Sequence, residues 1–255
     1  TPKKENSQKM EESNVEEEEQ EEQNNNEEEL ITPQALLITE ISLGKENSNE
    51  YVEIFNQTES EINLCSDENN CYYLSYFAST FNDEGVANHS WDDPSYNWQF
   101  PENLIITPNS YILIDIYGNS GGDFKVGEYS SQKLSNSSGS LSLFSNNPIY
   151  DGEEEKNKEE KIAYAQSLKV DAVAWRDSDK EPEVREGGAF FISQEKTLGR
   201  KYYSGKYVDS NNNINDIEGQ EPSIKINPTY PPGSVNDLSV AQGNEKNSVI
   251  LSWTS

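Results

Sequence analysis

Apolar residues along this chain fall into short runs separated by Asn, Gly, Ser and Pro. The runs read LLITEIS, EYVEIF, INLC, CYYLSYF, LIIT, SYILIDIY, SLSLF and VDAVAW. In SYILIDIY, Ile112, Ile114 and Ile116 occupy alternate positions, as expected for a strand whose successive side chains point to opposite faces. No segment shows a helical period together with capping residues. The pattern therefore predicts an all-β sandwich of many short strands.

Composition divides the chain into four predicted segments. Residues 1–30 contain 12 Glu and 3 Lys and no aromatic residue, so they bury too little apolar surface to offset the entropy of ordering and are predicted to be a disordered acidic tail. Residues 31–220 carry the strand pattern and are predicted to form the sandwich. Residues 221–233 are rich in proline and are predicted to be a linker. Residues 234–255 hold two more strand-like runs and are predicted to be the first strands of a truncated domain.

One charged stretch interrupts the strand pattern. Residues 145–161 read SNNPIYDGEEEKNKEEK, with acidic and lysine side chains in place of alternating apolar ones. We expect this stretch to be an exposed loop insertion or a hairpin extension.

The charge of the chain limits its partners. It has 47 acidic and 19 basic residues, a formal net charge of −28. A field of this sign repels phosphate backbones and disfavours nucleic-acid binding. No run of about 18 apolar residues occurs, so the sequence predicts no direct insertion into a membrane.

The two cysteines, Cys65 and Cys71, lie in the stretch CSDENNC. A metal site would need further soft ligands, and the chain has a single histidine, His89. The spacing suits a disulfide across a hairpin tip, with two free thiols as the alternative. A disulfide implies an oxidising compartment, so we expect an extracellular or cell-surface location.

Several motifs, in a fixed order, resemble those of the lamin tail domain family. LLITEISLGKENSNEYVEIFNQTESEINL is similar to the opening of that domain, and LIITPNSYILI, SLSLF and VDAVAW are similar to its later strands. The closing segment of the family pattern is matched by Arg200, Asp209, Asn211, Asp216 and Pro231. The resemblance runs from about Leu36 to Gly233. The final stretch VNDLSVAQGNEKNSVILSWT is similar to the first two strands of a fibronectin type III module.

The resemblance implies an immunoglobulin-like β-sandwich of the lamin tail type. Prokaryotic relatives of this kind sit in exported multi-domain proteins beside hydrolases, nucleases or adhesive repeats, and the animal domain binds proteins and chromatin. The chain departs from the family pattern where Leu64-Cys65-Ser66 replaces the usual L-S-G-W. Either the disulfide compensates for the missing core tryptophan, or Trp91, Trp98 or Trp175 fills the core.

Three acidic residues interrupt the apolar strand patterns. Glu40, Glu50 and Glu53 stand where the family pattern also has acids. We expect a structural role for them, and Glu53 in particular to face solvent or to accept hydrogen bonds from the N–H groups of a neighbouring loop.

The stretch DSNNNINDIE is a candidate calcium site. Asp209, Asn211, Asn213, Asn215 and Asp216 offer oxygen atoms at alternating positions, and calcium takes oxygen ligands. It is not an EF-hand loop, because Ile214 stands where Gly is needed. The alternative is an Asx-rich turn that bonds its own backbone. No other cofactor is indicated.

The stretch SWDDPSYNWQF is a candidate binding loop. If exposed, Trp91, Tyr96, Trp98 and Phe100 could stack on sugar rings or on a partner protein. The alternative is that some of these rings cap the open end of the sandwich.

No enzymatic motif is present in the sequence. A catalytic serine or cysteine needs a base, and His89 lies in a polar stretch. We therefore expect a non-catalytic interaction or scaffold module of an exported multi-domain surface or secreted protein, with a protein or a surface glycan as ligand. The alternative is an accessory domain of an exported hydrolase or nuclease whose catalytic domain lies outside this chain.

Overall fold

The structure is a computed structural model, and it describes residues 34–44, 49–82, 87–118, 120–126, 133–192 and 197–224, together with the backbone of two C-terminal strands. The predicted acidic tail, residues 225–233 of the predicted linker and most of the predicted C-terminal domain lie outside the described residues.

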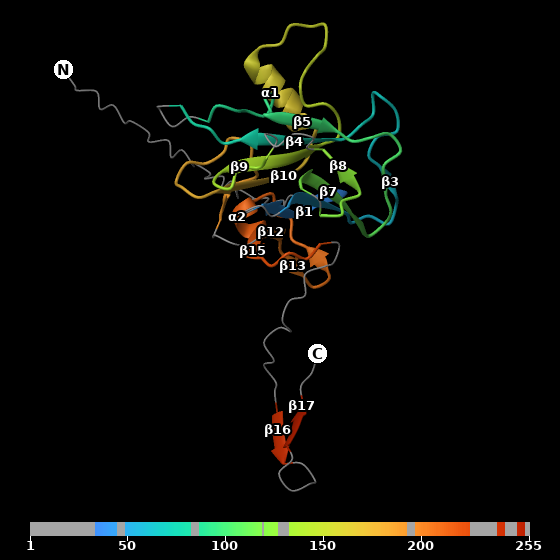
Figure 1. Ribbon diagram of the computed structural model, residues 1–255, viewed down its shortest axis with the longest axis vertical. Coiled ribbons are helices and arrows are strands. Elements are labelled where there is room, and N and C mark those ends of the chain that lie inside the picture. The colour runs from blue at the N-terminus through green and yellow to red at the C-terminus, as the bar shows by residue number, and fades with distance from the viewer. Residues whose placement is uncertain are drawn as a thin grey trace, which may run out of the picture. The chain divides into compact units, whose positions relative to one another are not determined.

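The first sheet has six strands in the order β15-β12-β1-β2-β7-β8 (Figure 1). These are β1 (Leu36–Leu43), β2 (Glu50–Asn56), β7 (Ser110–Tyr117), β8 (Phe124–Lys125), β12 (Thr197–Arg200) and β15 (Ile217–Gln220). Neighbours are antiparallel except β7 and β8. The register places Ile38 opposite Ile54 and Ile54 opposite Ile112, so apolar side chains line one face.

The second sheet has five strands in the order β11-β10-β9-β4-β5. These are β4 (Tyr73–Ala78), β5 (Tyr96–Gln99), β9 (Gly139–Phe144), β10 (Lys169–Arg176) and β11 (Phe190–Phe191). Only the β10–β11 pair is parallel. A Cβ atom on Gly139 would lie 2.9 Å from the ring of Trp175, so this strand needs glycine where the tryptophan crosses it.

Three two-stranded pairs complete the strand structure. They are β3 (Ile62–Asn63) with β6 (Ile105–Ile106), β13 (Tyr202–Tyr203) with β14 (Lys206–Tyr207), and β16 (Ser239–Gln242) with β17 (Val249–Ser252).

The two large sheets pack face to face around one apolar core, which confirms the predicted all-β sandwich. Ile38 and Ile114 from the first sheet pack in the same cluster as Leu74, Leu141 and Trp175 from the second. Trp175 is fully buried, so it is the tryptophan that fills the core. Trp91 is also buried, in a separate cluster.

The outer faces of both sheets are covered as well. Helix α1 (Lys158–Ser167) lies over the second sheet (Figure 1), where Ala165 packs with Phe77 and Phe144. The β13–β14 hairpin covers the first sheet, because Tyr207 packs on Phe55. Both sheets therefore carry near-continuous buried runs rather than a simple alternation of buried and exposed positions.

Helix α1 corrects the expectation that no segment is helical and that residues 145–161 are only a loop. Asn157 and Glu160 form a capping box, in which each side chain accepts from the backbone N–H of the other residue. The helix buries little besides Ala165, so it lacks the apolar stripe by which a helix is recognised in a sequence. A second, single-turn helix, α2 (Asn213–Asp216), begins after Asn212.

The predicted disulfide is confirmed. Cys65 and Cys71 are bonded and also pair through their backbones as an isolated antiparallel bridge. The side-chain amide of Gln99 on β5 donates to Cys71 Sγ at 3.1 Å. The bridge therefore closes the loop that leads from β3 into β4.

In the described part of the chain, no helix has the length and apolar character needed to cross a membrane.

Candidate functional site

Arg200, the last residue of β12, is the centre of a buried charged cluster. Its Nη2 donates to Asp171 Oδ1 at 2.7 Å and to Asp171 Oδ2 at 2.8 Å. Its Nη1 donates to Asp209 Oδ1 at 3.3 Å and to Val208 O at 3.1 Å, and its Nε donates to Ile38 O at 3.0 Å. The guanidinium thus contacts three separate segments of the chain and is fully buried.

Asp171 joins the two sheets. It lies on β10 in the second sheet, and its Oδ2 accepts from the backbone N–H of Ile38 on β1 at 2.6 Å. Both strands have a β-bulge at this point, between Ile38 and Glu40 on β1 and between Lys169 and Asp171 on β10. Bulges re-aim side chains, and here they accompany a polar contact across an otherwise apolar interface.

Burial and charge act in opposite directions on this pair. Burial raises the pKa of Asp171, and the neighbouring Arg200 opposes that rise. Burial alone would lower the pKa of Arg200, but Asp171 and Asp209 outweigh it, so the pKa of the guanidinium is raised. Arg200 therefore stays charged, and removing either partner would leave an uncompensated buried charge.

Glu186 and Lys169 lie beside this pair. Lys169 Nζ forms an ion pair with Glu186 Oε1 and also donates to Asn211 Oδ1 at 3.3 Å. The Glu186 side chain is only 2% exposed, and its Oε2 has no hydrogen-bond partner among the described residues. Burial, together with the charge of Asp171, raises the pKa of Glu186 to about 8.

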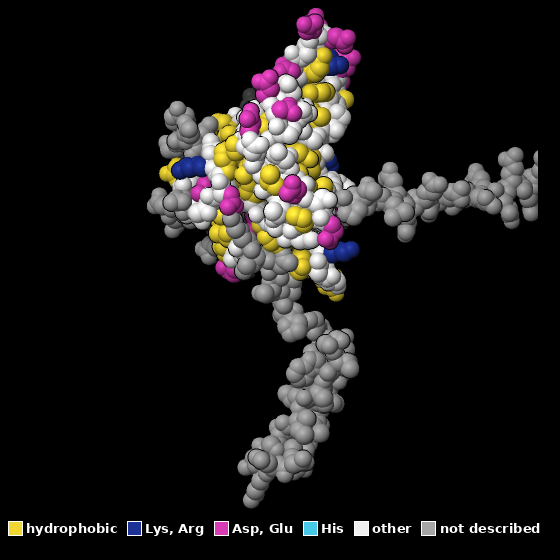
Figure 2. Space-filling view, turned by 90° about the vertical axis from the view of Figure 1, so that its right-hand side faces the viewer, with side chains coloured by type: hydrophobic (Ala, Val, Ile, Leu, Met, Phe, Trp, Pro, Cys, Tyr) yellow, Lys and Arg dark blue, Asp and Glu magenta, His cyan; other side chains and the backbone are white. Residues whose placement is uncertain are grey.

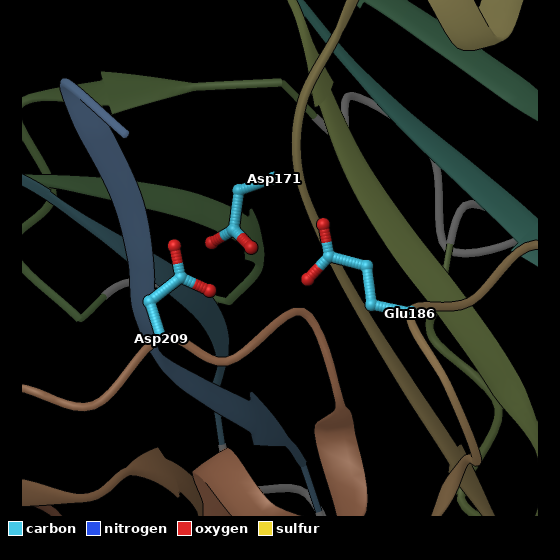
Figure 3. Close-up of side chains that lie close together, drawn as sticks. All are labelled: Asp171, Glu186 and Asp209. Carbon is cyan, nitrogen blue, oxygen red and sulfur yellow. The ribbon is translucent and has the colours of Figure 1, made fainter. Parts of the chain in front are cut away.

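Three carboxylates of the cluster converge, as Figure 3 shows. One oxygen each from Asp171, Glu186 and Asp209 lies within 4.8 Å of the other two. Asp209 comes from the turn before α2, and its Oδ2 is buried without a partner among the described residues. Such a set of oxygens could hold a hard cation.

Most of the residues predicted as calcium ligands instead make hydrogen bonds within the fold or lie exposed. The Asp216 carboxylate accepts from Ser210 N, Ser210 Oγ and Asn212 N at 2.7–3.1 Å, which closes the turn on itself. Asn213 is fully buried, and its amide bonds the backbone of β10 at Ala172 O and Ala174 N. Asn215 is exposed. These residues build an Asx-rich turn, the alternative considered from the sequence.

The structure thus does not bring the five predicted calcium ligands together at one point. Asp209 faces Asp171 and Glu186, whereas Asn211 accepts from Lys169, and Asn213 points into the sandwich. No motif in the sequence marks Glu186, because its partners are distant along the chain. The one local signal is the glycine that follows it: Gly187 has a φ of +59° in the structure, and a Cβ atom there would lie 2.6 Å from the Asn212 side chain.

The four aromatic residues predicted as a binding loop are also separated. Trp91 and Phe100 are buried in two apolar clusters and cannot meet a ligand. Tyr96 and Trp98 lie on strand β5, partly exposed and stacked, with ring centroids 5.7 Å apart and planes 12° apart. Tyr76 continues the stack inward from Tyr96, at 6.2 Å.

The three acidic residues on β1 and β2 are buried, so the option of a solvent-facing Glu53 is wrong. Glu53 Oε1 accepts from Thr39 Oγ1 at 2.8 Å. Glu50 Oε2 accepts from the N–H of Leu134, in a loop, at 2.8 Å. Glu40 accepts from the Tyr51 hydroxyl and from Ser223 N. All three serve as acceptors inside the fold, in keeping with the structural role that we expected.

A scan of protein-family models gives no match to this chain, and a search of the curated proteins gives none either.

Proposed function

We propose that this chain is a non-catalytic interaction module of an exported multi-domain protein and that it binds its ligand at strand β5. The observation that carries the proposal is the stacked pair Tyr96 and Trp98. Partly exposed, rigid aromatic faces are the groups on which sugar rings and protein side chains stack most favourably.

The position of β5 suits this task. It is the terminal strand of the five-stranded sheet and pairs with β4. Tyr96 and Trp98 share one face of the strand, and the amide side chains of Asn97 and Gln99 share the other. A ligand on the first of these faces would meet the two aromatic rings.

Several potentially reactive side chains have structural partners among the described residues, which supports a non-catalytic role. Cys65 and Cys71 are bonded to each other. The ring of His89 contacts the backbone oxygen of Asp93 at 2.9 Å. The carboxylates around Arg200 are enclosed by the two sheets. An exported location is supported by the disulfide.

Membership of the lamin tail family remains part of the proposal. Its support is that motif residues far apart in the sequence meet in space. Asp171 of VDAVAW bonds Arg200, and the closing motif brings Asp209 and Asp216 to the same guanidinium, at 3.3 and 3.8 Å. A set of motifs that converges on one buried cluster is what a family pattern built around that cluster would produce.

The surface charge narrows the class of ligand. Figure 2 shows acidic side chains gathered around α1 and the segment before it, and few basic ones on the face in view. A neutral glycan or a protein surface without strong negative charge fits this field better than a polyanion does.

A binding screen tests the proposal. The full chain would be applied to a glycan array and to a panel of displayed surface proteins, alongside Trp98→Thr and the matched control Tyr203→Thr, which alters a tyrosine that is 76% exposed on another sheet. We expect ligands that the wild-type and Tyr203→Thr chains bind and Trp98→Thr does not. Equal binding by all three, or no binding, would contradict the proposal.

A further inference from the structure

The buried cluster has more negative than positive side chains. Asp171, Glu186, Asp209 and Asp216 face two basic side chains, those of Arg200 and Lys169. If all are ionised, the interior carries two excess negative charges. Isolated buried charges are strongly disfavoured, so either protons or a bound cation must offset this excess.

The hydrogen bonds of the cluster leave particular oxygens unused. Arg200 and the backbone N–H of Ile38 donate hydrogen bonds to Asp171, and Lys169 donates one to Glu186 Oε1. Glu186 Oε2 and Asp209 Oδ2 are buried without a partner among the described residues, on side chains only 2% and 7% exposed. An unsatisfied buried acceptor is destabilising, and more so when it is charged.

We propose that Asp171, Glu186 and Asp209 bind one divalent cation, with Ca²⁺ as the class that fits. The three carboxylates converge within 4.8 Å (Figure 3), which a central ion with bonds of about 2.4 Å can span. All three offer oxygen, the ligand of hard cations. The ion would neutralise the excess charge and satisfy the two unpartnered oxygens.

Lys169 governs access to this site. Its side chain is 23% exposed, and its amine lies against Glu186 Oε1 and Asn211 Oδ1. The ammonium repels an incoming cation and occupies two further oxygens. Replacing it with an uncharged side chain would free both atoms, so Lys169→Met should bind the ion more tightly than the wild type does.

Calorimetric titration of the full chain with CaCl₂, after treatment with a chelator, tests the inference. We expect one saturable site, with a Kd of roughly 10⁻⁴–10⁻³ M as in extracellular modules. Glu186→Gln and Asp209→Asn should each weaken binding by at least about tenfold. Glu154→Gln, a change in the exposed acidic segment before α1, should leave it unchanged.

The same experiment defines failure. Equal affinity in Glu186→Gln, Asp209→Asn and wild type would show diffuse binding to the acidic surface and would overturn the inference, as would the absence of a saturable site. If both acid variants fail to fold by circular dichroism, Lys169→Met decides: tighter binding supports the site, and unchanged binding overturns it. Neither result bears on the β5 edge, so this site and the proposed function stand or fall separately.

Discussion

The charged cluster around Arg200 and the aromatic edge at β5 use their side chains in opposite ways. At the cluster, charged groups lie inside the protein and bond to each other across the two sheets and to the backbone of Ile38 on β1. At the edge, large apolar rings that could have been buried remain partly exposed. The first arrangement links the two sheets, and the second is the surface at which we propose that a partner binds.

The comparison shows why residue type alone does not indicate function. Acids and an arginine are the usual material of a catalytic site, yet here the Arg200–Asp171 pair lies where the two sheets meet. Tryptophan is the usual material of a core, and Trp175 is in the core, but Trp98 lies on a terminal strand. The surroundings of each side chain decide its role.

Arg200→Met would remove the centre of the buried cluster and should cause the largest loss in the free energy of unfolding. Removing one partner of a buried ion pair costs about 3–5 kcal/mol, because the remaining charge stays buried and unpaired. Denaturant unfolding measures the loss.

Arg185→Met is the matched control for that change. Arg185 pairs with Glu181 at 3.0 Å, with both side chains about a third exposed, so its loss should cost roughly 0–1 kcal/mol. Equal losses of unfolding free energy in Arg200→Met and Arg185→Met would mean that the cluster does not hold the two sheets together.

Removing the disulfide tests whether the Cys65–Cys71 bridge stabilises the fold independently of the cluster around Arg200. The Cys65–Cys71 bridge closes a loop with a sequence separation of 6, and closing so short a loop stabilises a fold by about 2 kcal/mol. Cys65→Ser with Cys71→Ser should lower the free energy of unfolding by that amount. Because the bridge and Arg200 share no hydrogen-bond partner, its cost should add to that of Arg200→Met, and strong non-additivity would contradict independent roles.

Two buried glutamates predict the dependence of stability on pH. Burial raises the pKa of Glu50 to about 7, and burial with the charge of Asp171 raises that of Glu186 to about 8, from an ordinary value of 4.5. Between the unfolded and folded values the folded chain holds more protons, so stability is highest at the acidic end and falls as pH rises. Each group contributes at most about 1.4 kcal/mol per pH unit.

Unfolding measured in chelator from about pH 5 to about pH 8 checks this. Glu186→Gln and Glu50→Gln should each flatten the decline, whereas Glu154→Gln should not. Stability that does not fall with pH over this range would show that both glutamates ionise in the folded protein as they do in the unfolded chain.

Trp98→Thr sharpens the second half of the comparison and should cost less stability than Arg200→Met. Trp98 pairs across the strands with Leu74 and packs partly against the core cluster. We expect a loss of about 1–2 kcal/mol in the unfolding free energy, together with loss of ligand binding. A loss as large as that of Arg200→Met would identify Trp98 as a core residue instead.

The strand pattern of the sequence was sufficient to predict the sandwich. The run Ser110–Tyr117 became β7, with Ile112, Ile114 and Ile116 in the core, because a period of two is a local property of the chain. Helix α1 was missed because its signal is a capping box within a charged segment rather than an apolar stripe.

The site was harder to predict because its contacts are distant in sequence. Asp171, Arg200 and Asp209 were recognisable only as parts of separate motifs, and Glu186 belonged to none of them. Glu53 resembled a solvated strand residue because its partner, Thr39, lies on another strand. Burial of a polar side chain depends on what packs over it, and a periodic pattern carries no information on that.

Hydrogen exchange of the native chain, resolved by residue, tests the central claim most directly: the cluster locks the two sheets, and the β5 edge is open. The amide of Ile38 donates to Asp171, and that of Ala174 donates to Asn213. The account predicts that both exchange only through global unfolding, whereas amides of β5 exchange much faster through local opening. Exchange at Ile38 and Ala174 as fast as in β5 would contradict it.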